Sequence, residues 1–198
     1  MGKALAAWMM VATALAAPAT GPREAVESAI VRVMNVFQDA EVRDPRAEIK
    51  KIARQLFDFD EMTRRTLSRH WAARTAEEQT EFAALFTDLL ERSYLTRIEG
   101  FAGEKLAFTG ESIDGNYATV KSKVTSPRRT ETVLEYRLHV RDGRWRVYDV
   151  LIDGVSFVST YRSQFDRIIT AESYGALVDK LRRKVFDTTV AERGKQRL

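Results

Sequence analysis

Residues 146–165 read RVYDVLIDGVSFVSTYRSQF, and within them the hydrophobic pattern changes from that of a strand to that of a helix. The first part is rich in valine, isoleucine and leucine, as strands of a packed sheet are. Gly154 interrupts the run, and Phe157, Tyr161 and Phe165 then recur every fourth residue, which is typical of one helix face. The stretch has no cysteine, no histidine and no serine in a nucleophile-elbow pattern. It predicts a strand followed by a helix, without an evident catalytic group.

Three further strands are predicted upstream, because apolar residues alternate with a period of two after Gly100. The dipeptide Asp142–Gly143 is a hairpin signal before the last strand. We therefore expect a four-stranded antiparallel meander with one apolar and one polar face. Its strands are the segments KLAFTG (105–110), NYATVKSKV (116–124), ETVLEYRLHV (131–140) and RWRVYDVLI (144–152).

Helices are predicted before the strands. From Pro22 onward apolar residues recur at steps of three and four, and a second, short helix follows Pro45. Asp58 or Asp60 can cap a third helix that runs to about Leu67. A fourth helix begins at the sequence TAEE (75–78), which has the spacing of a capping box.

Two more helices are predicted after the strands, one starting near Ser156 and one carrying Tyr174, Leu177 and Leu181. The fold class is therefore α+β, a four-stranded antiparallel sheet meander covered by N-terminal and C-terminal helices. The last strand is apolar on both faces through Val150 and Ile152. This surplus of apolar surface is consistent with an apolar cavity between the sheet and the helices, of the kind that receives an apolar ligand.

The chain is predicted to contain one domain, at 22–186, because 198 residues with only four prolines leave no room for a long linker. Residues 1–16 have the outline of a cleaved signal peptide: a short basic start, an uncharged apolar run and an A-x-A site at Ala14 and Ala16. The alternative is an N-terminal anchor helix, but the run is shorter than the ~20 residues that a membrane span needs. Residues 187–198 lack apolar periodicity and are expected to form a flexible tail.

The composition excludes several classes of function. The chain has no cysteine and only two histidines, so a disulfide framework, a thiolate zinc site and a multi-histidine metal site are not expected. It has no glycine-rich cofactor motif, so no cofactor is predicted. The net charge of +4 is scattered, with SPRRT and KLRRK as isolated basic runs, and this argues against nucleic acid as a partner.

The titratable side chains each allow a structural interpretation. His70 is expected between helices and His139 on the solvated face of a strand. Asp58, Asp60 and Glu61 cluster at a helix start, where capping and the helix dipole favour acidic residues.

Asp149 lies within an apolar strand, so it is either a catalytic acid or a buried carboxylate that accepts hydrogen bonds from an arginine or a backbone amide. No second carboxylate lies near it in the sequence to share acid–base chemistry, and the structural role is preferred.

Three segments together resemble the MlaC/Ttg2D family, exported proteins first labelled toluene-tolerance proteins that assist a lipid ABC transporter. The segments are FDFDEMTRRTLSRHW (57–71), EEQTEFAALFTDLLERSYL (77–95) and WRVYDVLIDGVSFVSTYRSQF (145–165). The resemblance implies a periplasmic phospholipid carrier, not an enzyme, that holds acyl tails in a deep apolar pocket. Such carriers shuttle lipid between an inner-membrane lipid ABC transporter complex and an outer-membrane lipoprotein–porin complex, and so maintain outer-membrane lipid asymmetry.

The resemblance also implies a set of pocket residues in this chain. Arg162 either meets a phosphate near the pocket mouth or pairs with Asp149, because arginine suits both. Two other functions remain open: a carrier of another hydrophobe such as a hopanoid or isoprenoid lipid, and a cone-fold enzyme acting through Asp149 or His70. The implied lipid-binding residues are Leu67, Trp71, Phe86, Leu90, Tyr136, Leu138, Trp145, Val147, Phe157, Tyr161, Arg162 and Phe165.

Overall fold

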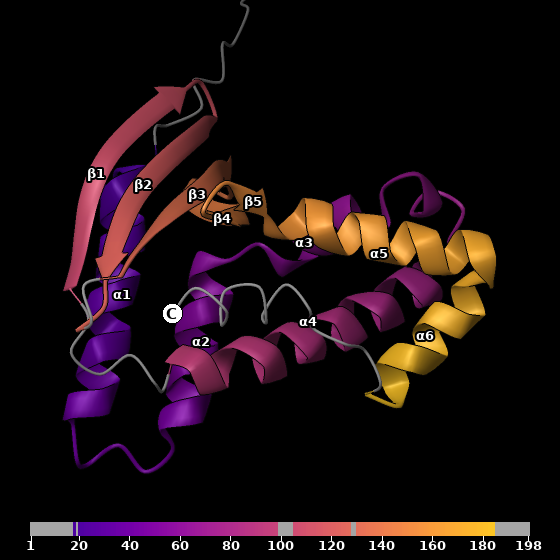
Figure 1. Cartoon of the computed structure of the whole chain (residues 1–198), viewed down its shortest axis with the longest axis horizontal. Coiled ribbons are helices and arrows are strands. Elements are labelled where there is room, and N and C mark those ends of the chain that lie inside the picture. Colours follow the sequence, from indigo (N-terminus) through magenta and orange to yellow (C-terminus); the bar gives the residue numbers. More distant parts are fainter. Residues whose placement is uncertain (1–17, 19, 99–104, 128–129, 185–198) are drawn as a thin grey trace, which may run out of the picture.

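In the part of the chain that the structure describes, five antiparallel strands in sequential order form the sheet (Figure 1). The computed structural model describes residues 18, 20–98, 105–127 and 130–184, so the predicted signal peptide and flexible tail lie outside the described residues. The four predicted strands are confirmed, and a two-residue fifth strand is added after them. The strands are β1 (Lys105–Asp114), β2 (Tyr117–Thr125), β3 (Glu131–Arg141), β4 (Arg144–Ile152) and β5 (Val155–Ser156).

Two tight turns with positive backbone φ angles connect the last three strands. Asp142 and Gly143 have φ angles of 52° and 68° between β3 and β4, and Asp153 and Gly154 have 48° and 81° between β4 and β5. Positive φ at both central residues matches the twist of the flanking strands, and Asp-Gly favours it. The predicted hairpin is confirmed, and Gly154, predicted to break the last strand, reverses the chain to form β5.

A β-bulge at Tyr148 explains why β4 carries apolar residues on both faces. Arg137 pairs with Asp149 whereas Leu138 pairs with Val147, which leaves Tyr148 without a partner on β3. The extra residue shifts the alternation of side chains along the strand. As a result Val147 and Val150 both pack in the same core, and Asp149 between them is turned toward the helix that follows the sheet.

Within the described residues six α-helices accompany the sheet, and the caps predicted for the third and fourth are present. The side chain of Asp58 accepts a hydrogen bond of 3.0 Å from the amide of Glu61. Thr75 and Glu78 cap each other's amides at 3.2 and 3.0 Å, which confirms the capping box. The helices are α1 (Pro22–Gln38), α2 (Pro45–Leu56), α3 (Phe59–Leu67), α4 (Ala76–Ile98), α5 (Phe157–Ala171) and α6 (Tyr174–Arg182), with a 3₁₀ turn η1 (Ser68–His70) after α3.

The apolar side chains form two cores. The sheet core lies between the sheet and α1 and α2, and consists of Val26, Ala29, Ile52, Leu56, Ala118, Val120, Tyr136, Leu138, Trp145 and Val147. The helical core lies among α3 to α6, which extend beyond the sheet in Figure 1. It consists of Met62, Leu67, Phe82, Phe86, Leu89, Leu90, Phe157, Val158, Tyr161, Phe165, Leu177, Val178 and Leu181. Phe57, between α2 and α3, packs against both cores.

The α+β class, the antiparallel meander and the flanking helices are thus as predicted. The segment between α2 and α3 joins the helical core to the sheet. Phe57 forms a parallel bridge with Val147, and the amide of Asp58 donates to the carbonyl of Val147 at 2.8 Å. No helix within the described part of the chain is both long enough and apolar enough to cross a membrane.

Candidate functional site

The structure divides the twelve predicted lipid-binding residues between the two cores. Leu67, Phe86, Leu90, Phe157, Tyr161 and Phe165 belong to the helical core, and Trp71 packs against it from its edge. Tyr136, Leu138, Trp145 and Val147 belong to the sheet core. Arg162 is exposed on α5 and lies in neither.

The aromatic stripe of α5, formed by Phe157, Tyr161 and Phe165, packs closely against other rings of the helical core. The ring of Phe86 lies 5.3 Å from that of Tyr161 and 5.5 Å from that of Phe165, in edge-to-face geometry. All three side chains are completely buried. In the arrangement described, the space beside these residues is therefore filled by protein.

A cleft of about 630 Å³ lies where the two cores meet. It runs between α4 on one side and the α2–α3 segment and the β3–β4 turn on the other. Its apolar part comes from Phe57, Phe59, Ala83 and Ala84. The residues that line this cleft are Arg54, Phe57, Asp58, Phe59, Asp60, Ala83, Ala84, Thr87, Asp88, Glu91, Arg141, Asp142 and Arg146.

None of the twelve predicted residues lines this cleft, and the identity of the residues that contact a ligand stays a prediction. Sequence reasoning missed the cleft because its lining comes from four separate segments, each contributing a few side chains. One local signal was available. Ala83, Ala84 and Thr87 give α4 a face of small residues beside the aromatic face of Phe82 and Phe86.

At one end of the cleft two cations share one carboxylate. The carboxylate of Glu91 on α4 is almost buried and accepts hydrogen bonds from Nε and Nη2 of Arg54 on α2, at 3.0 and 2.9 Å. Lys50 contacts the other oxygen of Glu91 at 3.1 Å. Arg146 on β4 donates to the backbone carbonyl of Arg54 at 2.8 Å, and its buried Nε has no acceptor among the described residues.

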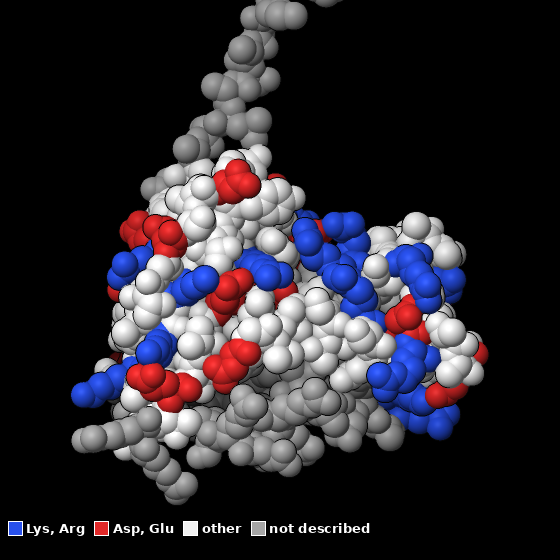
Figure 2. All heavy atoms as spheres, turned by 45° about the horizontal axis from the view of Figure 1, so that its top comes forward, with Lys and Arg blue, Asp and Glu red and all other residues white. Residues whose placement is uncertain are grey.

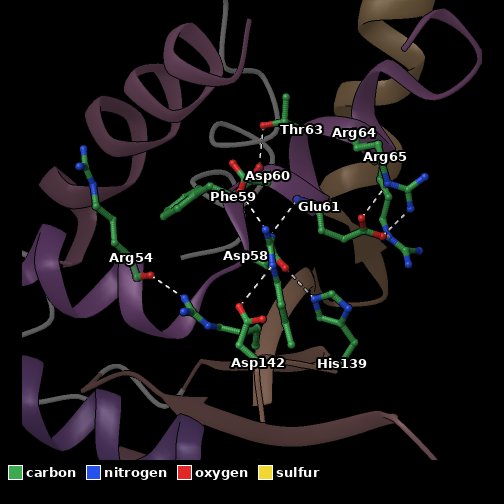
Figure 3. Close-up of polar contacts among 12 residues, drawn as sticks. Arg54, Asp58, Phe59, Asp60, Glu61, Thr63, Arg64, Arg65, His139 and Asp142 are labelled. Carbon is green, nitrogen blue, oxygen red and sulfur yellow. Dashed lines mark hydrogen bonds and ion pairs between the residues drawn. The ribbon is translucent and has the colours of Figure 1, made fainter. Parts of the chain in front are cut away.

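At the other end, Asp58 is the centre of a polar cluster shown in Figure 3. It accepts hydrogen bonds from Arg141 and, at 2.8 Å, from Nε2 of His139. Burial raises the pKa of Asp58, but the hydrogen bonds from Arg141, the Glu61 amide and His139 outweigh it and hold this pKa below its ordinary value. The prediction that His139 is solvated is wrong, because α3 packs over this end of the strand and supplies its partner.

The other titratable residues have structural partners. Asp149 accepts hydrogen bonds from the hydroxyl of Ser156 at 2.6 Å and the amide of Val158 at 2.9 Å, which confirms its predicted structural role at the start of α5. Its arginine partner is Arg137, at 3.7 Å. The pairing of Asp149 with Arg162 is therefore wrong.

Arg162 and His70 both link α5 to the segment around α3. Arg162 donates to the backbone carbonyl of Arg65 at 3.0 Å. His70 lies between helices as predicted, where its Nε2 is 2.8 Å from Asp166 on α5, a carboxylate that also pairs with Arg69.

Both basic and acidic side chains occur on the face of the molecule shown in Figure 2, and Lys and Arg are more frequent on its right side. Within the described residues, no group of three or more histidine, aspartate or glutamate side chains is arranged to hold a metal ion.

Comparison with known proteins identifies the family. The family model "MlaC protein" matches residues 24–183. The intermembrane phospholipid transport system binding protein MlaC of Haemophilus influenzae is 21% identical over 122 residues, which are 59% of this chain and 57% of that relative. A phospholipid-binding protein of Ralstonia solanacearum, solved in complex with a phospholipid, has the same fold, with a TM-score of 0.73 and 24% identity over 83% of this chain and 96% of that one. Because the family model spans both cores and the cleft between them, the chain belongs to the MlaC family.

Proposed function

We propose that this protein is a phospholipid-binding carrier of the periplasm. The observation that carries the proposal is the family match over residues 24–183, supported by the fold shared with a protein solved in complex with a phospholipid. The apolar run and the A-x-A site at the N-terminus are consistent with export. The protein would exchange lipid with an inner-membrane lipid ABC transporter complex and an outer-membrane lipoprotein–porin complex, and so maintain outer-membrane lipid asymmetry.

The cleft is where lipid enters in this proposal. Its volume of about 630 Å³ lies within the range of small-molecule sites, about 300–1,000 Å³. Its apolar part lies beside Phe57, the residue in contact with both cores. Acyl chains reach the predicted lining residues when the helical core and the sheet core move apart at this side chain.

The free energy for holding lipid comes from hydrocarbon burial. Each methylene moved from water into an apolar site contributes about 0.8 kcal/mol, so two acyl chains are held without reactive groups. The partial separation of the cores costs packing energy, which the bound chains offset by filling the space. The ion pairs of Glu91 with Arg54 and Lys50 connect α4 to α2 across the cleft and oppose this opening.

A binding role accords better with the polar contacts than an enzymatic one. Asp149 and His70, the two residues that a cone-fold enzyme would use, both form hydrogen bonds that hold α5 in place. Neither lines the cleft.

The test is to purify the mature protein without detergent, extract it with organic solvent and identify the lipids by mass spectrometry. We expect near-stoichiometric diacyl phospholipid. Protein that carries no lipid and takes none from vesicles would reject the carrier role. A hopanoid or isoprenoid lipid in the extract would mean that the protein carries another hydrophobe in place of phospholipid. Steady hydrolysis of phospholipid would favour the enzyme.

A further inference from the structure

We infer that one face of the helical core, built by α3, η1 and α5, docks on an anionic membrane surface, an inference that goes beyond the proposed function. Lys and Arg are more frequent on the right side of Figure 2, the side on which Figure 1 places α5 and α6. We call the surface the arginine face. It is formed by the exposed or partly exposed side chains of Arg64, Arg65, Arg69, Arg162 and Arg167.

The two arginines of α3 lie together at the border of this face with the sheet. Arg64 and Arg65 both contact the carboxylate of Glu61, each at 2.7 Å (Figure 3). The guanidinium of Arg65 also lies 4.1 Å from the centre of the Tyr148 ring on β4, a cation–π contact. One carboxylate therefore serves two cations here.

Contacts continue the arginine face from α3 to α5 and η1. Arg162 on α5 donates to the backbone carbonyl of Arg65 at 3.0 Å. Asp166, one turn later on α5, contacts Arg69 at 2.7 Å and lies 2.8 Å from Nε2 of His70. The arginines of the three elements thus lie side by side, although about a hundred residues separate α3 from α5 in the sequence.

The arginine face carries an excess of positive charge. Two carboxylates, Glu61 and Asp166, lie among its five guanidiniums, which leaves three positive charges without a matching acid. In the part of the chain that the structure describes, no ion pair joins Arg162 or Arg167 to a carboxylate. Guanidinium groups donate charge-assisted hydrogen bonds to phosphate oxygens, so the uncompensated charge suits phosphates.

The start of α3 belongs to the cleft and does not offset this charge. Asp58 and Asp60 both bind Arg141, and all three residues line the cleft. Because α3 has nine residues and is therefore about 14 Å long, the cleft lies within one helix length of the arginine face. Docking through this face holds the cleft close to the membrane.

A lipid surface fits the arginine face better than an acidic protein does. Protein interfaces have apolar and aromatic anchors at their centre and charges at the rim. The exposed large apolar side chains of the described residues lie on α1 and on the strands, and none lies on α3, η1 or α5. Attraction to the phosphates of an anionic membrane is electrostatic and requires no such anchor.

The experiment measures co-sedimentation of the purified protein with vesicles of two compositions. One is pure phosphatidylcholine, and the other contains equal parts of phosphatidylcholine and phosphatidylglycerol. We expect binding to the anionic vesicles only, and on the order of tenfold weaker binding when salt rises from about 0.05 M to about 1 M, because the Debye length then shrinks to about 3 Å. Equal binding to both compositions, or binding to neither, would overturn the inference.

The lipid content of the same protein, measured by mass spectrometry, keeps this test separate from that of the proposed function. Protein that carries phospholipid but does not bind anionic vesicles would overturn the docking inference and leave the carrier role intact. Protein that binds anionic vesicles but takes up no lipid would support the docking inference and reject the carrier role.

Variants test whether the arginine face is responsible. In Arg64→Gln/Arg69→Gln both replaced side chains are exposed, and a second nitrogen partner remains on each carboxylate, so folding is retained. A basic residue near an anionic membrane contributes about fivefold in affinity, and both arginines are partly neutralised, so we expect a loss of about tenfold. The matched control, Arg43→Gln/Lys51→Gln, removes two exposed positive charges outside α3, η1 and α5 and should retain the binding. Equal losses in the two double variants would mean that net charge alone is responsible and would overturn the inference.

Two further measurements identify the chemistry of the contact. Arg64→Lys/Arg69→Lys keeps both charges and should restore most of the binding that the glutamine variant loses. Failure to do so would contradict electrostatic docking. Native membrane vesicles serve as the test for a protein partner. Binding to these vesicles that disappears after they are treated with protease, together with no binding to pure lipid, would assign the face to an acidic protein and overturn the inference.

Discussion

Asp58 and His139 are joined by a hydrogen bond of 2.8 Å although 81 residues separate them in the sequence. The same carboxylate caps α3 through the amide of Glu61 and binds Arg141. One side chain therefore connects the first helix of the helical core to strand β3 and to the turn that lines the cleft. The geometry of the cleft depends on this connection.

Replacing Asp58 should destabilise the fold. Asp58→Asn retains a cap acceptor but loses the charge-assisted hydrogen bonds with Arg141 and His139, each of which contributes about 1.5–3 kcal/mol at most. Because Arg141 is partly exposed and can be solvated, we expect a loss of about 2–3 kcal/mol in the free energy of unfolding, measured with urea at pH 7. Asp60→Asn, at an exposed carboxylate of the same arginine, is the control and should change it by less than about 0.5 kcal/mol. Similar values for the two variants would contradict the central role of Asp58.

The same carboxylate should make stability depend on pH in the acid range. Its folded-state pKa lies below the ordinary value of 3.8. A lowered pKa means that its stabilisation is fully present above the unfolded-state value and is lost as pH falls through the folded-state value. The difference in unfolding free energy between wild type and Asp58→Asn should therefore be constant at neutral pH and shrink below about pH 4. A difference that grows on acidification would show the opposite sign and refute this assignment.

Filling the cleft should block lipid uptake without unfolding the protein. Ala84 on α4 is exposed and lines the cleft, so Ala84→Trp places a large ring there without entering either core. We expect a normal thermal unfolding midpoint and severalfold less lipid after expression. Ala72→Trp, at an exposed position outside the cleft, should retain the lipid. Full lipid load in Ala84→Trp would place the entrance elsewhere.

The aromatic stripe of α5 allows a test of the predicted lining. Phe165 is completely buried against Phe82, Phe86 and Tyr161. In lipid-free protein, Phe165→Ala should lower the free energy of unfolding by about 3–5 kcal/mol, the usual loss for a buried phenylalanine. If Phe165 contacts lipid after the cores separate, lipid retention should also fall, which vesicle extraction measures. Unchanged retention in folded variant protein would make Phe165 a packing residue only.

Asp149 should contribute to the stability of the fold and not to lipid binding. Asp149→Asn weakens the hydrogen bonds to Ser156 and Val158 and the contact with Arg137. We expect a loss of about 1–3 kcal/mol in the free energy of unfolding, typical of a disturbed buried polar group, with lipid binding per folded molecule unchanged. Turnover of a phospholipid or an ester by wild type that disappears in this variant would instead support an enzyme.

Local patterns in the sequence were sufficient to predict the helices and strands of the fold. Asp58, Thr75 and Ser156 mark helix starts because a cap acts within three residues of itself. Asp142–Gly143 marks a hairpin because the turn requires positive φ at those positions. Such signals depend only on neighbouring residues, and the strands and helices they delimit were predicted correctly.

Contacts between residues far apart in the sequence could be identified only from the tertiary structure. Nothing near His139 in the sequence indicates Asp58 as its partner, and the sequence suggested Arg162 for Asp149 where the bulge at Tyr148 favours Arg137. The aromatic residues of α5 and the apolar residues of β4, all predicted from the sequence to contact lipid, belong to two separate cores. The apolar residues and the period with which they recur can be read from each segment alone, because they are properties of that segment. The apolar faces that meet, and the charges that line the cleft between them, are known only from the folded chain, because they depend on how distant segments are oriented in space.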